Sequence, residues 1–244
     1  MLDPAYTLPI LALGFAVGLA HALDADHVAA VAAMTGQGGS RRSIVARGAA
    51  WGLGHSAALF VICSVVLLLG LTITERVGAA LELAVGIMIM FLGLRVFWTL
   101  WRERIHIHVH EHDGVTHLHA HSHKTDDKDH RMSVHDHMHS ARALLPTLGV
   151  GLLHGAAGSA GLLVLIVASA ESASQAMVAF ALFGLGSILG MICLTAAASY
   201  PLAFINRGAT WMRTSLAVAI GGLAVLVGGG VTLESLGGLG VSIQ

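Results

Sequence analysis

The sequence predicts an all-α fold, a polytopic membrane helix bundle of about six transmembrane helices. Of the 244 residues, 55% are hydrophobic and 11% are charged, whereas about 25% of the residues of a soluble domain carry charge. The apolar residues also form long runs, and roughly 18 or more nearly uncharged residues are enough for one helix to cross a bilayer. Both observations favour a membrane protein over a soluble one.

Six apolar runs reach this length, at residues 7–34, 44–71, 77–100, 144–170, 174–200 and 211–233. The first run has no Lys or Arg before it and carries Asp24 and Asp26, which is unlike a cleavable signal peptide. We therefore expect this run to be kept as a transmembrane segment. Cys63 and Cys193 fall within the runs at no disulfide or zinc-ribbon spacing, so we interpret them as packing residues.

The two halves of the sequence resemble each other weakly at an offset of about 133 residues. Three short stretches match in the same order: residues 18–21 with 151–154, 51–54 with 183–186, and 83–85 with 216–218. A unit of three spans reverses direction across the membrane, so the second copy would be inverted, as in many secondary transporters. We predict a first membrane half at 1–101, a loop at 102–142 and a second membrane half at 143–244.

The predicted loop is rich in histidine. It contains twelve: His106, His108, His110, His112, His117, His119, His121, His123, His130, His135, His137 and His139. Tracts of this kind bind metal through the density of their imidazoles. A plain solvated linker is the alternative, but it would not require so many histidines. Because the loop has few large apolar residues to bury, we expect it to be largely disordered without metal.

The basic residues predict the orientation of the chain, because short loops rich in Lys and Arg stay cytoplasmic. With both termini outside the cytoplasm and the His-rich loop inside it, Arg76 alone of the 13 basic residues is extracytoplasmic. The others then lie on the cytoplasmic side: Arg41, Arg42, Arg47, Arg95, Arg102, Arg104, Lys124, Lys128, Arg131, Arg142, Arg207 and Arg213.

Ionisable side chains inside the runs are costly and usually mark an ion path. The first run places His21, Asp24, Asp26 and His27 within seven residues. In a continuous helix, at about 100° per residue, Asp26 would lie away from the face shared by the other three. All four residues can meet one ion only if the helix is interrupted there, as transporter helices often are.

Later runs add His55, Glu82 and His154. Glu82 is either a site residue or an interfacial carboxylate near a helix end. His154 matches His21 in the repeat but has no acidic neighbour. Imidazole and carboxylate together suit nickel, cobalt, zinc or iron, whereas calcium and magnesium prefer all-oxygen sites. The candidate metal ligands are therefore His21, Asp24, Asp26, His27, His55, Glu82 and His154, and we expect no prosthetic group.

The pattern formed by His21, Asp26 and His27 resembles the signature of the nickel/cobalt transporter family. Gly-His-Ser at 54–56 is similar to a second motif of that family, residues 151–161 resemble its urease-accessory branch, and the His-rich loop resembles its efflux members. The resemblance implies that His21, Asp26 and His27 recognise the metal, with His55 next. The chain departs from larger members in starting with the motif helix and in lacking their Leu-Gly-x-Asp-Thr motif.

We therefore expect a membrane transporter of divalent nickel or cobalt, with zinc and iron as further candidates, and not an enzyme. The alternatives are a membrane-anchored metal sensor or metallochaperone and, less favoured, an intramembrane metalloenzyme. The chain has no zinc-protease motif His-Glu-x-x-His. The expected partners are the metal ion, membrane lipid and a cytoplasmic metallochaperone. A net charge of −1 gives no reason to expect nucleic acid. Uptake and efflux both remain open.

Overall fold

The computed structural model describes residues 4–35, 40–102, 106–112, 115–121, 144–158, 172–205 and 210–241, with the single residues 161, 166 and 170. This part of the chain forms seven helices and one two-stranded hairpin. In order they are α1 (Pro4–His21), α2 (Ala25–Thr35), α3 (Arg41–Leu69), α4 (Glu75–Arg102), β1 (His106–His112), β2 (Val115–His121), α5 (Leu145–Ala157), α7 (Ala173–Ile205) and α8 (Thr210–Gly238). The predicted helical class is confirmed for the membrane part.

Four of these helices are long and apolar enough to cross a membrane: α3, α4, residues Ala173–Tyr200 of α7 and residues Thr214–Gly238 of α8. Helices α1 and α2 pass the same test together, but they bend by 53° at a short break, so they form a fifth span if counted as one. Helix α5 is apolar but has only 13 residues, fewer than a full span needs. Nine of the 27 residues in the predicted run at 144–170 lie outside the described residues.

The ends of the long helices follow their sequence. Ser40 precedes α3, and its hydroxyl accepts a hydrogen bond from the backbone N–H of Ser43 at 3.2 Å, as a helix N-cap does. Gly70 ends α3 in the left-handed conformation, with φ of 62°, which glycine adopts without steric cost. The Thr74 hydroxyl then accepts from the backbone N–H of Val77 in the first turn of α4. A connection of five residues, 70–74, therefore separates α3 from α4.

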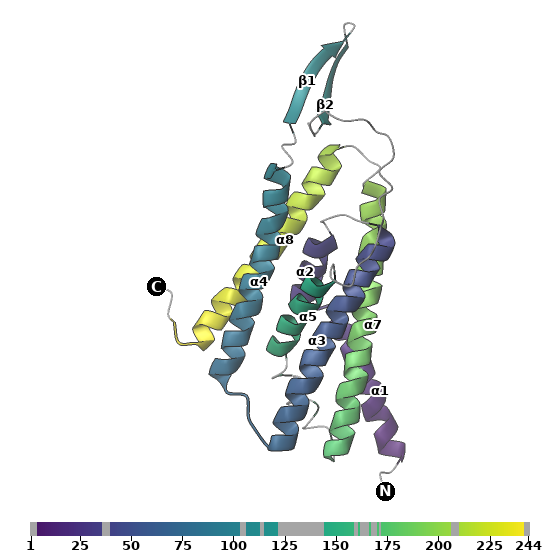
Figure 1. Cartoon of the computed structure of the whole chain (residues 1–244), viewed down its shortest axis with the longest axis vertical. Coiled ribbons are helices and arrows are strands. Elements are labelled where there is room, and N and C mark those ends of the chain that lie inside the picture. Colours follow the sequence, from purple (N-terminus) through teal and green to yellow (C-terminus); the bar gives the residue numbers. More distant parts are fainter. Residues whose placement is uncertain are drawn as a thin grey trace.

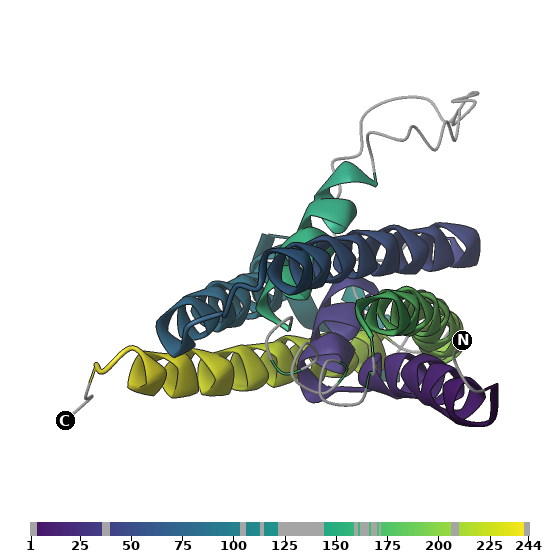
Figure 2. The same cartoon turned by 90° about the horizontal axis from the view of Figure 1, so that it is seen from below.

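The helices lie in two groups with α2 and α5 between them (Figure 1). Seen from below, α4 and α8 run side by side on one side of the molecule, and α1, α3 and α7 gather on the other (Figure 2). One buried cluster joins α2, α4, α5 and α8 through Ala29, Ala33, Ile89, Ala157 and Ala224. The short helices therefore sit at the centre of the bundle, where they contact both groups.

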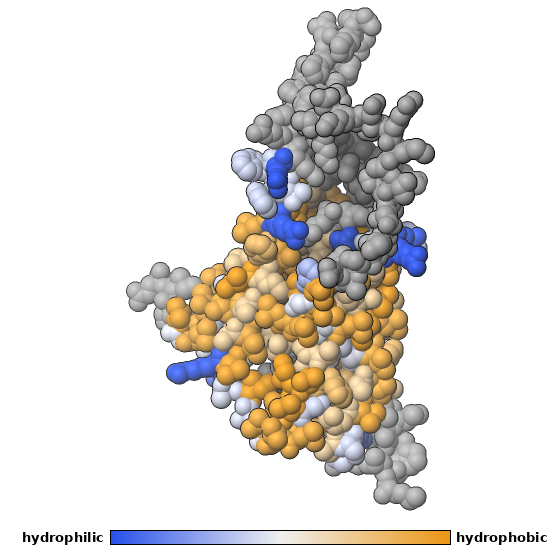
Figure 3. Space-filling view, in the orientation of Figure 1, coloured by the Kyte–Doolittle hydropathy of each residue, from blue (hydrophilic) through white to orange (hydrophobic). Residues whose placement is uncertain are grey.

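The outer surface of the bundle is apolar. Leu68, Leu69, Phe91 and Leu226 are each more than 60% exposed, and hydrophobic residues cover most of the coloured surface in Figure 3. A soluble monomer rarely exposes contiguous apolar surface on this scale. The surface fits a hydrocarbon environment, as the low charge content predicts.

The hairpin lies beyond the end of α4 (Figure 1). β1 and β2 pair antiparallel, from His106 opposite His121 to His112 opposite Val115. The sequence predicts a largely disordered loop, and a low count of apolar residues does not reveal these strands. The signal is the alternation of histidine with Ile107, Val109 or Leu118, because a period of two is typical of strands. The remaining loop histidines lie outside the described residues: His123, His130, His135, His137 and His139.

Candidate metal centre

The break between α1 and α2 brings together the polar residues of the first run. Helix α1 ends at His21 and α2 begins at Ala25. The turn is held by backbone hydrogen bonds from Leu23 N–H to Ala20 (2.8 Å) and from Asp24 N–H to His21 (3.1 Å). The centroids of the His21 and His27 rings then lie 4.5 Å apart. The interruption that the sequence requires for a common site is present.

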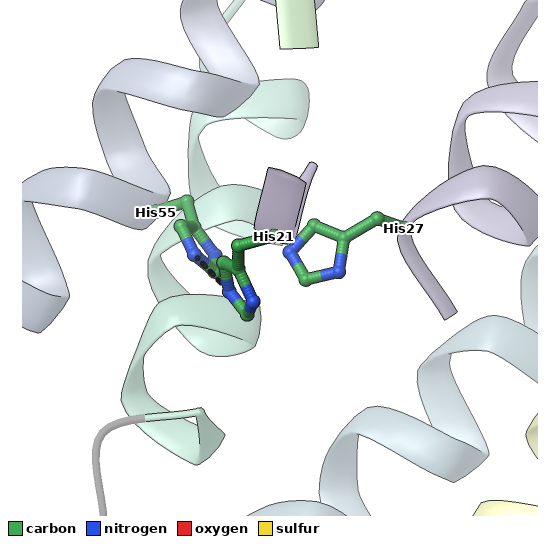
Figure 4. A group of neighbouring side chains, drawn as sticks. All are labelled: His21, His27 and His55. Atoms are coloured by element: carbon green, nitrogen blue, oxygen red, sulfur yellow. Dashed lines mark hydrogen bonds between the residues drawn. The ribbon is translucent and has the colours of Figure 1, made fainter. Parts of the chain in front are cut away.

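Helix α3 adds a third imidazole. His55 is fully buried, and its Nε2 lies 3.2 Å from Nε2 of His21. Its ring centroid is 4.9 Å from that of His27. The three rings converge from separate helices in Figure 4. Ligand atoms of His21, His27 and His55 all lie within 4.8 Å of one another, close enough to hold one metal ion. We call these residues the three-histidine group.

A second group contains a carboxylate and shares one residue with the first. Asp26 Oδ1 accepts from His27 Nδ1 at 2.9 Å, and Asp26 Oδ2 accepts from His154 Nε2 at 2.8 Å. His154 comes from α5 and is 2% exposed. Asp26, His27 and His154 also place ligand atoms within 4.8 Å of one another. We call them the mixed group, and His27 belongs to both.

Carboxylates determine which nitrogen of three imidazoles carries the proton. An ionised carboxylate only accepts hydrogen bonds, so the contacts with Asp26 put the proton on Nδ1 of His27 and on Nε2 of His154. The contact of Asp24 with Nδ1 of His21, at 2.7 Å, does the same for that ring. The other nitrogen of each ring then carries a lone pair, which in His21 faces Nε2 of His55 at 3.2 Å. Histidines that bind metals are typically oriented by such carboxylate partners.

The free nitrogens are the strongest feature of the site. His27 Nε2, His55 Nδ1 and His154 Nδ1 are buried and have no hydrogen-bond partner within the described chain. A buried polar atom without a partner costs roughly 1–3 kcal/mol, and here three occur within one cluster. A histidine that only fills a core would be expected to satisfy both nitrogens. Buried nitrogens with lone pairs and no hydrogen-bond partner are suited to bind a cation.

Two candidates from the sequence occupy different positions. The Asp24 side chain is 55% exposed and contacts the cluster only through His21. Glu82 lies on the exposed side of α4 and belongs to neither group. The structure thus brings together His21, Asp26, His27, His55 and His154, keeps Asp24 at their edge and leaves Glu82 apart.

Two aromatic residues that the sequence does not single out form walls of the cluster. Trp51 is fully buried, with its ring centroid 5.4 Å from that of His27 and 5.6 Å from that of His154. The Phe183 ring lies 5.3 Å from His21. These residues occupy matching positions of the weak internal repeat, which is the signal that could have identified them. Their rings cover part of the surface of the imidazoles of His21, His27 and His154.

Residues 7–243 match the NicO family, described as high-affinity nickel-transport protein. The chain belongs to this family. Over 211 residues it is also 29% identical to the urease accessory protein UreH of Bacillus sp. (strain TB-90), covering 84% of this chain and 83% of that protein. No solved structure matches it. NicO membership confirms the resemblance found in the motifs and identifies an integral membrane protein of a nickel-transport family, not an enzyme.

Proposed function

We propose that this NicO member carries nickel and cobalt ions across the membrane. In this proposal, the three-histidine group and the mixed group bind the ion during its passage. The observation that carries the proposal is a cluster of buried imidazoles in which Nε2 of His27, Nδ1 of His55 and Nδ1 of His154 have no hydrogen-bond partner within the described chain. Asp26 orients two of these rings, those of His27 and His154. Imidazole ligands suit nickel and cobalt better than calcium or magnesium. The description of the NicO family as high-affinity nickel-transport protein also supports nickel.

The charge of the cluster supports a divalent ion. Neutral imidazoles add no charge, while Asp24 and Asp26 together carry two negative charges. A carboxylate inside hydrocarbon is costly unless it is paired, and a dication would balance both. The proposed role of Asp26 is therefore double, because it orients His27 and His154 and also offsets the charge of the ion.

We also propose six spans arranged as an inverted repeat of three. Matching glycines support it. A methyl group added to Gly18 would collide with the carbonyl oxygen of Phe183, and one added to Gly151 would collide with that of Trp51. In the same way, Gly54 lies against Leu148 and Leu152, and Gly186 lies against Phe15 and Leu19. All of these residues correspond at the offset of about 133 residues, so α1 packs on α7 as α5 packs on α3.

In this proposal the hairpin end of the bundle is cytoplasmic. Arg41, at the start of α3, stacks on the Tyr200 ring at 3.7 Å. Trp98, Trp101 and Trp211, at the nearby ends of α4 and α8, are all more than half exposed. Exposed aromatic residues beside arginines are typical of a membrane interface, and arginines favour its cytoplasmic side. Arg76 lies at the opposite end, in the first turn of α4.

The orientation can be tested with a membrane-impermeant maleimide on intact cells. In a background without Cys63 and Cys193, an Arg76→Cys variant is expected to react from outside. A Lys124→Cys variant is expected to react only after the membrane is permeabilised. Labelling of Lys124→Cys in intact cells would reverse the orientation and remove the loop from the cytoplasm.

Transport itself is tested by reconstituting the purified protein in liposomes. We expect Ni²⁺ and Co²⁺ to cross, whereas Mg²⁺ and Ca²⁺ should not. An inside-negative potential should accelerate entry, because it is worth about 5 kcal/mol per 100 mV for a dication. Zn²⁺ and Fe²⁺ in the same series measure how far selectivity extends. Tight metal binding without flux of any ion would instead indicate a membrane-anchored sensor or metallochaperone. A cytoplasmic metallochaperone is the proposed partner of the His-rich loop.

A further inference from the structure

The hydroxyl of Ser187, on α7, is fully buried and has no hydrogen-bond partner within the described chain. A serine or threonine inside a helix can satisfy its hydroxyl by bonding to the carbonyl one turn earlier. Thr195, on the same helix, donates to the carbonyl of Met191 in this way at 2.7 Å. Thr232 and Ser235 make the equivalent bond on α8. Ser187 does not, so its hydroxyl is buried without compensation.

The side chain of Ser187 points into the bundle. The residues on either side of it face the two helices that pack on α7, because Gly186 lies against α1 and Ile188 lies against α3. At about 100° per residue, Ser187 lies between these two directions. Leu185 and Leu189 lie on the opposite side of α7, and both are exposed on the outer surface. The hydroxyl is therefore directed between α1 and α3, which flank α7 in Figure 2.

The three-histidine group lies at the same level of the bundle. Phe183 is one turn before Ser187 on α7, and its ring centroid lies 5.3 Å from that of His21. Met191 is one turn after Ser187 and belongs to the buried cluster that contains Trp51, which packs on the three-histidine group. Ser187 is therefore the polar residue between two large side chains that line this group.

Ser187 and His55 are related in two further ways. Residues 51–54 match 183–186 in the weak internal repeat, and the next pair at the same offset is His55 with Ser187. The hydroxyl of the residue after His55 also donates to the carbonyl of Gly184 at 3.0 Å. This bond holds α3 against α7 close to both residues. The two halves thus direct a histidine and a serine to one place.

We propose that the Ser187 hydroxyl is a further ligand of the ion bound at the three-histidine group. Three imidazole nitrogens and one hydroxyl oxygen form a mixed set of nitrogen and oxygen ligands, which Ni²⁺ accepts. The hydroxyl is neutral, so it adds a ligand and leaves the charge balance with Asp24 and Asp26 unchanged. The ion would give the hydroxyl oxygen the partner that it lacks within the described chain. The assignment rests on the proposed function, because it takes the three-histidine group as an ion site.

A cysteine in place of Ser187 makes the contact visible. In the full-length purified protein without Cys63 and Cys193, Ser187→Cys is loaded with Ni²⁺ and its near-ultraviolet absorption is recorded. A thiolate bound to Ni²⁺ absorbs intensely by charge transfer from ligand to metal, and the His-rich loop has no cysteine that could contribute. We expect this band in Ser187→Cys. The matched control, Ser64→Cys, should show none.

Ser64 is a close match because its hydroxyl is also buried and has no partner among the described residues. It lies on α3 nine residues beyond His55, which is about 13 Å along the helix axis at 1.5 Å per residue. A thiol at Ser64 is therefore buried to a similar degree but cannot reach an ion at the three-histidine group.

Alanine variants separate a metal ligand from a residue that only packs. In the metal-free protein, Ser187→Ala and Ser64→Ala each remove a buried hydroxyl without a partner, so both should leave the melting temperature unchanged or raise it. Bound Ni²⁺ stabilises the folded protein, and this increase should be smaller in Ser187→Ala than in the wild type or Ser64→Ala. We expect the Ni²⁺ affinity of Ser187→Ala to fall at least about tenfold, as measured by competition with a chromophoric chelator.

Two results would overturn the assignment of Ser187. One is the absence of the charge-transfer band in a Ser187→Cys protein that binds Ni²⁺, and the other is equal stabilisation of Ser187→Ala and the wild type by Ni²⁺. His27→Ala distinguishes this failure from failure of the proposed function. If Ni²⁺ binding depends on His27 but not on Ser187, the proposed function stands and the further ligand is wrong. If His27→Ala binds Ni²⁺ as the wild type does, the proposed function itself is wrong.

Discussion

Replacing His27 with alanine is expected to reduce Ni²⁺ flux to the level of protein-free liposomes. His27 is the one residue in both the three-histidine group and the mixed group, so its loss removes a ligand from each. Asp26→Asn should have a comparable effect. It removes the charge, and a neutral amide has only one oxygen with which to accept from His27 and His154. Flux of radioactive Ni²⁺ and bound metal per protein are measured together.

Two carboxylate variants serve as controls for the His27 experiment. Asp24→Asn should weaken Ni²⁺ affinity by roughly 10- to 100-fold, as expected for a residue that acts through a ligand, because Asp24 contacts only His21 in the cluster. Glu82→Gln should transport as the wild type does, since Glu82 lies outside both groups. Near-normal flux in a correctly inserted His27→Ala protein would show that the ion does not pass this cluster.

The second large effect is expected from a single methyl group. In Gly151→Ala the new Cβ would collide with the backbone carbonyl of Trp51 and approach His55 N to 3.0 Å. Overpacking of this kind typically costs about 1–3 kcal/mol, and here the contact is with backbone, which cannot move alone. We expect a melting temperature lower by several degrees and weaker Ni²⁺ binding, because displacing α5 also displaces His154.

Gly149 provides the matched control on the same helix. A methyl group at Gly149 meets nothing within 4 Å, so Gly149→Ala should be neutral or slightly stabilising, given that alanine favours helix over glycine by about 1 kcal/mol. Thermal unfolding of both variants in detergent makes the comparison. If Gly151→Ala unfolds at the same temperature as the wild type, the close approach of α3 and α5 is wrong. Gly18→Ala, the repeat counterpart against Phe183, is expected to behave as Gly151→Ala does.

Much of the cluster could be predicted from the sequence because charged groups in an apolar run are conspicuous. His21, Asp26 and His27 stand out for this reason, and their spacing already requires a broken helix. The same logic left two roles open for Glu82, as a site residue or as an interfacial carboxylate. A carboxylate within an apolar run can lie on the side of its helix that packs on other helices or on the opposite, exposed side. The run around Glu82 is apolar on all sides, so the sequence does not show which of the two sides Glu82 occupies.

Other features depend on contacts between distant segments. Trp51 and Phe183 look like ordinary core residues until the fold brings their rings beside the histidines. One partner of Asp26 also depends on the fold. The spacing of the motif places Asp26 beside His27, but it does not predict the contact with His154, which lies 128 residues later. The weak repeat matches His154 with His21, which made His154 a candidate for the site but did not identify its partner.

If both groups bind the ion, as proposed, the sharing of His27 limits how many ions the cluster can hold at one time. A dication that moves from the three-histidine group to the mixed group can keep one nitrogen ligand throughout, while its other ligands are exchanged. It therefore need not be stripped bare in a medium where an unpaired charge is most costly. A second ion cannot fill the other group independently while His27 is engaged. On the proposed route, ions would therefore pass this cluster one at a time.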